Sequence, residues 1–149
     1  MATLLTIDAS VFVAACQPHE SGYAASLSLM QSVLDADVPL VEPAILPVEV
    51  GAALCRAGRD AAVAREYAEG ILVLPHLVLV TVDERLARRA LVIAAQCRLR
   101  GADALYVTVA ARYGARLVTL DAEQLARAPA AVAAHKPDAA ARLLQIRPQ

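Results

Sequence analysis

The chain has 149 residues, 58% of them hydrophobic, and a formal net charge of -1 at pH 7. This length suits one folded domain, and the apolar content excludes a disordered chain. The near-neutral charge excludes a protein that coats nucleic acid through charge alone, and an aromatic content of 3% excludes a base-stacking platform for single strands. We therefore expect one domain over residues 1–149, with some apolar surface buried against a partner or a second copy.

The cysteines and apolar segments narrow the chemistry and the location. Cys16, Cys55 and Cys97 lie far apart among Ala, Val and Leu, so we expect buried thiols in a reducing compartment. The three histidines are equally scattered, which disfavours a zinc site. The longest apolar run, residues 71–82, is broken by proline and is too short to span a bilayer. Asp8 interrupts the N-terminal apolar segment, so we predict a cytoplasmic protein with no targeting signal and no membrane partner.

Short apolar runs alternate with segments of helical periodicity along the whole chain. In chain order we predict a strand at 4–7, helices at 10–16 and 23–34, a strand at 39–41, helices at 45–56 and 60–74, a buried strand at 77–82, helices at 83–98 and 102–113, a strand at 116–120, a short helix beginning at Asp121 and an edge strand at 143–146. The strands are apolar throughout, which is typical of a parallel sheet covered on both faces. We therefore predict a three-layer α/β/α fold, in which ligands bind at the carboxyl ends of the strands where the strand order reverses.

Four acids stand where that rule predicts a site. Asp8 ends the first strand, Asp121 ends a later one, Asp103 opens a helix and Glu49 lies in the first turns of another. The three aspartates also fit as ordinary helix N-caps, and that alternative stays open. Glu49 does not fit it, because its neighbours at helical spacing are apolar and no Lys or Arg lies within one turn. A hard cation such as Mg²⁺ or Mn²⁺ would satisfy Glu49 and Asp103 together. Glu42, just before Pro43, is a possible extra acid of this set, although a solvated strand end is the favoured interpretation.

Four motifs follow one another along the chain: IDAS at 7–10, PVEVGAAL at 47–54, GADALYVTVA at 101–110 and LVTLD at 117–121. Together they resemble the PIN-domain family, and in particular the VapC toxins of bacterial toxin–antitoxin pairs. Each motif alone is weak, but their order and spacing cover nearly the whole chain. The resemblance implies a PIN-like parallel sheet with the acids gathered at its carboxyl edge.

The resemblance also implies roles for particular residues. On the family pattern Asp8 and Asp103 are the principal metal ligands, and Glu49 and Asp121 complete a catalytic acidic cluster. The pattern further implies that Ser10 and Thr119 support this cluster by hydrogen bonding. The implied activity is Mg²⁺- or Mn²⁺-dependent endoribonuclease cleavage of RNA, with a cognate antitoxin and a homodimer or higher homo-oligomer as partners. Two alternatives stay open: a PIN nuclease that processes RNA outside a toxin–antitoxin pair, and a catalytically silent PIN scaffold.

Two other classes of protein also cluster acids at strand ends. A phosphorylatable receiver module is expected to carry a lysine near the end of a late strand, but Lys136, the only lysine, lies in an Ala/Pro-rich stretch. A phosphatase of the Asp-x-Asp type needs a second acid where this chain has Ser10. Arg85, Arg88 and Arg89 on one predicted helix could contact phosphates, although a solvated helix face is the favoured interpretation.

Overall fold

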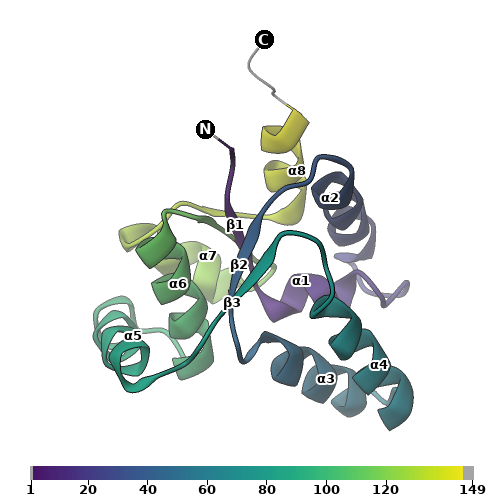
Figure 1. The fold of residues 1–149 in the computed structure, drawn as a ribbon, viewed down its shortest axis with the longest axis horizontal. Coiled ribbons are helices and arrows are strands. Elements are labelled where there is room, and N and C mark those ends of the chain that lie inside the picture. The colour runs from purple at the N-terminus through teal and green to yellow at the C-terminus, as the bar shows by residue number, and fades with distance from the viewer. Residues whose placement is uncertain (1, 146–149) are drawn as a thin grey trace.

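The computed structural model describes residues 2–145, which form a five-stranded sheet between two layers of helices (Figure 1). The strands are β1 Leu5–Ile7, β2 Leu40–Pro43, β3 Leu77–Val80, β4 Arg116–Val118 and β5 Ala134–His135. All of them pair in parallel, in the order β3-β2-β1-β4-β5. Strand order therefore reverses at β1, which lies between β2 and β4. The predicted parallel sheet in a three-layer α/β/α fold is confirmed.

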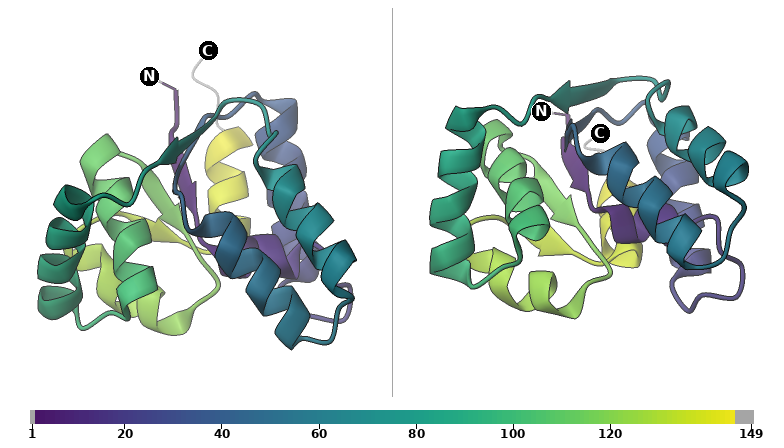
Figure 2. Two further views of the ribbon diagram at one scale, coloured as in Figure 1. Left: turned by 60° about the horizontal axis from the view of Figure 1, so that its bottom comes forward. Right: turned by 90° about the horizontal axis from the view of Figure 1, so that it is seen from below.

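Eight α-helices flank the sheet within the described residues. They are α1 Ala9–Ala14, α2 Tyr23–Asp35, α3 Leu46–Arg56, α4 Ala61–Ile71, α5 Glu84–Cys97, α6 Gly101–Tyr113, α7 Ala122–Arg127 and α8 Pro137–Gln145. Helices α5, α6 and α7 cover one face, and α1 to α4 with α8 cover the other (Figure 2). In this part of the chain, none of the helices has the length and apolar character needed to cross a membrane.

The core is centred on β1 and β4. Leu5, Ile7, Leu117 and Val118 are each at most 1% exposed, because strands flank them on both sides and helices cover them on both faces. Ile7 lies opposite Val118 in the parallel register, so both strands end at the same edge of the sheet. Helix α6 packs against β1, β2 and β4 and closes one face over this edge. The carboxyl ends of the central strands therefore lie between the two helical layers.

The two ends of the sheet differ from the sequence-based expectation. Residues 143–145 belong to α8, so the edge strand expected at 143–146 is wrong; residue 146 lies outside the described residues. The edge position is instead taken by the two-residue β5, and α8 packs against α2 through its small buried alanines. At the opposite edge β3 pairs only with β2, so Val78 is 57% exposed and the prediction of a buried strand is wrong.

The cysteines also differ from expectation. Cys55 is exposed and Cys16 and Cys97 are only half-buried, so the prediction of three buried thiols is wrong. Cys55 lies on the outer side of α3, where alanine-rich neighbours mark the solvent face rather than the core.

Candidate active site at the carboxyl edge of the sheet

Asp8 lies at the end of β1, where the strand order reverses. Its backbone N–H donates to the Val118 carbonyl at 2.9 Å, and the chain then turns into α1. The residue is 5% exposed, and its Oδ2 accepts hydrogen bonds from the Ser10 N–H at 3.1 Å and from the Thr119 hydroxyl at 3.3 Å. Asp8 is therefore the N-cap of α1, and the same carboxylate is held in place by the neighbouring strand end.

Asp121 is joined to Asp8 through Thr119. The Thr119 Oγ1 that donates to Asp8 also accepts the Asp121 N–H at 3.0 Å. Asp121 caps α7 by accepting the Gln124 N–H at 2.9 Å, as the capping alternative expected. The Ser10 hydroxyl accepts the Leu120 N–H at 3.1 Å and so ties the start of α1 to the segment between β4 and α7.

Asp103 lies in the first turn of α6, on the opposite helical layer from α3. The N-cap of α6 is Arg100, so the capping alternative is wrong for Asp103. Asp103 Oδ1 instead accepts a hydrogen bond from Gln124 Nε2 at 2.7 Å, and the same nitrogen donates to Asp8 Oδ1 at 3.3 Å. Burial raises the pKa of Asp103, and the Asp8 and Asp121 carboxylates add to this effect.

Glu49 approaches the same place from α3. Burial raises its pKa, the carboxylates of Asp8 and Asp103 raise it further, and the Tyr106 hydroxyl and Arg56 oppose the shift. Its Oε1 is buried and has no hydrogen-bond partner among the described residues. The four acids singled out from sequence therefore come from β1, α3, α6 and the start of α7 to one end of the sheet, close enough to influence one another.

Glu42 is a further acid that the sequence argument misjudged. It was expected at a solvated strand end, yet it is 0% exposed, because β2 lies between β1 and β3. Its Oε1 accepts the Ile7 N–H at 2.6 Å, and its Oε2 has no hydrogen-bond partner among the described residues. Burial raises the pKa of Glu42 well above its ordinary value, and the nearby Asp8 carboxylate adds to the shift.

Gln124 was not singled out from sequence at all. It is 0% exposed, although Asp121 and Arg127 lie three positions before and after it. The uniformly apolar neighbours that marked Glu49 are therefore missing here, and no local signal in the sequence identifies Gln124.

Unpartnered buried atoms gather around this edge. Within the described residues the buried side-chain atoms that lack a hydrogen bond are Glu42 Oε2, Glu49 Oε1, Tyr106 OH, Gln124 Oε1 and, elsewhere, Ser26 Oγ. Buried polar atoms are normally satisfied by protein, water or an ion. The first four belong to residues that line or adjoin the acid site. The Tyr106 hydroxyl lies near enough to Glu49 to lower its pKa, so these two groups partly satisfy each other, whereas Glu42 Oε2 and Gln124 Oε1 are open to water or a ligand.

The donor set fits a hard cation held by few protein ligands. Over residues 2–145, no three acidic, His or Cys side chains lie close enough together to enclose one ion. Mg²⁺ keeps several waters and is commonly held by one or two carboxylates, unlike zinc in its closed structural sites. The carboxylates of Asp8 and Asp103, with the Glu49 oxygen nearby, match that open pattern.

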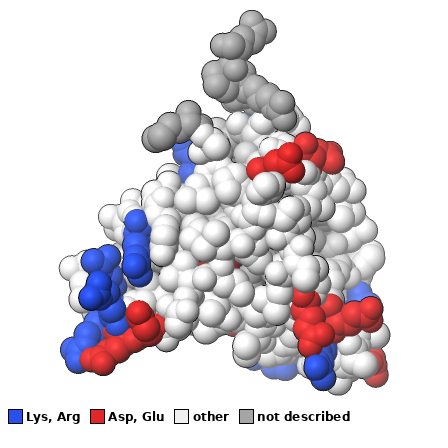
Figure 3. Space-filling view, in the orientation of Figure 1, with Lys and Arg blue, Asp and Glu red and all other residues white. Residues whose placement is uncertain are grey.

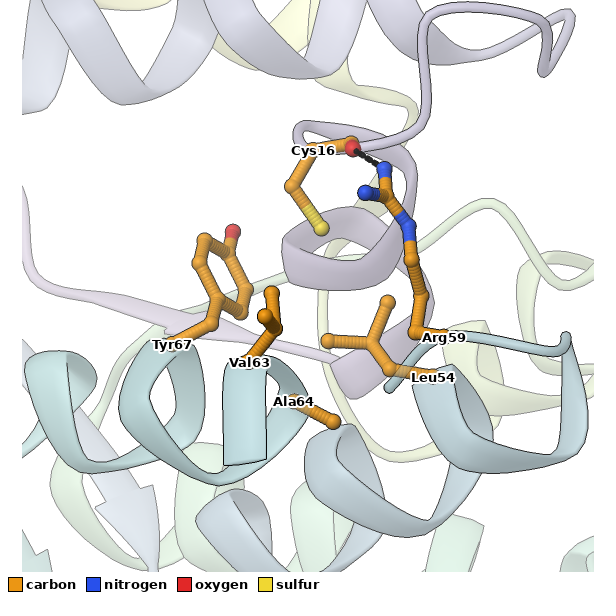
Figure 4. Close-up of a pocket in the computed structure, with 6 residues that line it drawn as sticks. All are labelled: Cys16, Leu54, Arg59, Val63, Ala64 and Tyr67. Atoms are coloured by element: carbon orange, nitrogen blue, oxygen red, sulfur yellow. Dashed lines mark hydrogen bonds between the residues drawn. The ribbon is translucent and has the colours of Figure 1, made fainter. Parts of the chain in front are cut away.

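A hollow of about 330 Å³ lies between α1 and the segments before α2 and after β4, and none of the four site acids lines it. It is lined by Ser10, Val13, Ala14, Glu20, Ser21, Gly22 and Leu120. A different, smaller cavity of about 60 Å³ is lined by residues of α3 and α4, by Cys16 after α1 and by Arg59, whose Nη2 donates to the Cys16 carbonyl at 2.7 Å (Figure 4). This cavity holds no carboxylate, and the Tyr67 hydroxyl beside it already donates to the Phe12 carbonyl, so it lacks the chemistry of the acid site.

Basic side chains gather on α5, at one side of the molecule (Figure 3). Arg85, Arg88 and Arg89 are exposed, and Arg88 pairs with Glu84 at 2.7 Å, as expected of a solvated helix face. Arg89 also lines a hollow of about 350 Å³ between α5 and α6, together with Arg112.

The fold and the acids at its switch point define a three-layer α/β/α protein with a carboxylate site at the edge of a parallel sheet. The PIN domain family model matches residues 5–131, and the chain belongs to the PIN-domain family. PIN domains are nucleases that generally use divalent metals, so the chain belongs with hydrolases that act on nucleic acids. No curated protein sequence matches the chain.

Solved structures share this fold over nearly the whole chain. PAE2754 from Pyrobaculum aerophilum is 26% identical, with a TM-score of 0.69 over 99% of this chain and 100% of its own. A chain of VapBC2 from Rickettsia felis, bound to a promoter DNA fragment, is 14% identical, with a TM-score of 0.64 over 90% of this chain and 98% of its own. A chain of VapBC-1 from nontypeable Haemophilus influenzae is 10% identical, with a TM-score of 0.64 over 91% and 98%.

Proposed function

We propose that this protein is a divalent-metal-dependent endoribonuclease and the toxin of a type II toxin–antitoxin pair. The observation that carries the nuclease proposal is the approach of Asp8 and Asp103 to one buried amide from different elements, with Glu49 and Asp121 beside them. Two acids exposed on the surface would be solvated by water and would need no buried amide between them. Ionised carboxylates that share a half-buried pocket repel one another, and a cation relieves that repulsion.

In this proposal Asp8 and Asp103 hold Mg²⁺ or Mn²⁺, and Glu49 and Asp121 complete the acidic cluster. When bound, such an ion lowers the pKa of water, orients it towards phosphorus and stabilises the leaving oxygen. The hydrogen bonds from Ser10 N–H and the Thr119 hydroxyl keep the Asp8 carboxylate facing the site. Glu49 is the acid suited to accept a proton during the reaction, because a carboxylate of raised pKa is a stronger base when ionised.

RNA is the proposed substrate. In this proposal a nucleotide enters the hollow that Ser10 and Leu120 line, and Ser10 is joined to Asp8 by its backbone N–H. Arg100 lies near enough to Asp103 to lower the pKa of that carboxyl, and so it is placed to meet a phosphate entering the site. The formal net charge of -1 leaves little long-range attraction, so binding depends on these local contacts.

An antitoxin is the proposed protein partner, and the proposed location is the cytoplasm. The support is that two of the similar structures are described as VapBC assemblies. Exposed apolar side chains also remain on the surface, among them Val63 on α4 and Leu34 on α2. In this proposal the antitoxin binds across α2 and α4 and covers such side chains. Two copies of the chain associate through further apolar surface.

Cleavage assays test the nuclease proposal. Purified protein with Mg²⁺ or Mn²⁺ is expected to cut RNA, and EDTA is expected to stop the reaction. Asp8→Asn should abolish cleavage and leave the circular dichroism spectrum unchanged, because Asn can still cap α1. Gln17→Met, at a buried residue outside the acid site, is the matched control and should cut RNA. Cleavage by Asp8→Asn in the presence of EDTA would contradict the metal mechanism.

Growth assays test the toxin assignment separately. Expression of the wild-type chain alone is expected to arrest growth, and expression of Asp103→Asn is not. Co-expression with a small neighbouring gene product should restore growth. If the wild-type chain cuts RNA in vitro but is harmless in the cell, the alternative of an RNA-processing PIN nuclease is favoured over the toxin.

A further inference from the structure

Gln124 contacts more of the acid cluster than any other described residue does. Its backbone N–H donates to Asp121 Oδ1 at 2.9 Å, and its side-chain Nε2 donates to Asp103 Oδ1 at 2.7 Å and to Asp8 Oδ1 at 3.3 Å. One residue therefore binds three of the four acids. The side-chain amide faces the carboxylates of Asp8 and Asp103. An ionised carboxylate can only accept hydrogen bonds, so the amide nitrogen, and not the amide oxygen, must point towards them.

Gln124 is held in place by protein contacts, because no part of it reaches solvent. The residue is 0% exposed, and its backbone is held in the first turn of α7 by the Asp121 cap. Its Oε1 is buried and has no partner among the described residues, although a glutamine in a merely structural role would be expected to have both ends satisfied. The side chain is therefore oriented by the two carboxylates.

We infer that Gln124 is a positioning residue of the acid site, whose amide bridges Asp8 and Asp103 and offsets their repulsion in the metal-free protein. This inference rests on the proposed function and deepens it. The amide places a hydrogen-bond donor between two carboxylates, one at the end of β1 and one on α6. It keeps the end of β1 and the first turn of α6 at a fixed separation before a cation arrives.

A double-mutant cycle in EDTA tests this role without any metal. Gln124→Met keeps the side-chain length and removes the donor, and it should lower the melting temperature by about 3–6 °C. In an Asp103→Asn background one of the two charges is absent, so the same change should cost less than about half as much. Gln17→Met is the matched control, since Gln17 is also a buried glutamine and its Oε1 accepts from Arg59; its cost should be equal in both backgrounds.

A second variant keeps the test decisive if Gln124→Met is too unstable to purify. Gln124→Glu has the same shape and replaces the donor by a third carboxylate, so in EDTA it should melt below the wild type, and Asp103→Asn should recover most of that loss. Added Mg²⁺ should raise the melting temperature of both Gln124 variants more than that of the wild type, and that of Gln17→Met by the wild-type amount.

The outcomes separate this inference from the proposed function. Equal losses for Gln124→Met in both backgrounds would overturn the positioning role and leave Gln124 as a packing residue. Unequal losses with no Mg²⁺ response in any variant would support the positioning role, while the metal-dependent proposed function would fail. Unequal losses together with the larger Mg²⁺ response support both.

Discussion

Replacing Asp103 by Asn should raise the melting temperature of the metal-free protein at neutral pH. The change removes one negative charge from the acid site and keeps the shape of the side chain. The amide oxygen of Asn can still accept the hydrogen bond that Gln124 donates. Burial, together with the carboxylates of Asp8 and Asp121, raises the pKa of Asp103, so the folded protein holds its charged form at a cost in stability.

The size of this gain follows from the geometry. Gln124 Nε2 lies 2.7 Å from Asp103 Oδ1 and 3.3 Å from Asp8 Oδ1. The two oxygens are therefore at most about 6 Å apart, where two unit charges repel by about 3 kcal/mol at an effective dielectric constant near 20. Asp103 is only half-buried, and solvent screening reduces this to about 1 kcal/mol. For a domain of this size the change corresponds to about 3 °C in melting temperature.

The assay is a thermal melt in EDTA from about pH 4 to about pH 8. An acid of raised folded pKa binds more protons when folded than when unfolded, so its cost begins above the ordinary value of 3.8 and is complete above the folded pKa. The gain of Asp103→Asn should therefore be full near neutrality and vanish towards about pH 4. Asp60→Asn, which keeps the cap of α4 and removes an equal charge outside the cluster, is the control and should show no gain. A lower melting temperature for Asp103→Asn at neutral pH, or a gain that persists in acid, would refute the reasoning.

Three further outcomes are expected. Burial raises the pKa of Glu42 well above 4.5, so the melting temperature of the wild type should fall as pH rises above that value. Glu42→Gln lacks this titrating group and should show a smaller fall, and an equal fall in both proteins would contradict the reasoning. Thr119→Val removes the hydroxyl that donates to Asp8, so it should lower the free energy of unfolding in urea by about 1–2 kcal/mol and lower kcat for RNA cleavage. The control Thr108→Val loses a hydroxyl bonded within α6 and should leave kcat unchanged. Equal kcat values for the two variants would count against the supporting role of Thr119. Mg²⁺ should raise the wild-type melting temperature in a concentration-dependent way and that of Asp103→Asn much less, and an equal response would separate Asp103 from the metal.

Local patterns in the sequence were enough to predict most of the fold. Apolar runs predicted β1, β2 and β4 because a strand flanked by two others and covered on both faces admits few polar side chains. The run at β3 is equally apolar, although that strand lies at the edge of the sheet and is partly exposed. Helix ends followed from local chemistry: Asp60 caps α4 through the Ala62 and Val63 N–H groups, and Gly114 ends α6 with a φ of 66°, a conformation that suits glycine. These features depend on residues within one or two turns of each other.

The approach of the acids to one another was also predictable in outline. Parallel strands end at the same edge of a sheet. Once both strands were recognised, Asp8 and Asp121 were therefore expected at the same end of the molecule. The motif order suggested that Glu49 and Asp103 join them. Which of the aspartates cap helices was not predictable, because Asp8 and Asp121 do so and Asp103 does not.

Only the tertiary structure decided how polar groups are buried and partnered. Glu42 has the local sequence of an exposed strand end, but its place between β1 and β3 buries it completely. Gln124 binds Asp8 and Asp103, residues 116 and 21 positions away in the chain. Residues 143–145 are helical because α8 can bury its alanines against α2. Burial and hydrogen bonding at these sites depend on which distant segments pack together, whereas the periodicity of a sequence reports only how one segment presents its own faces.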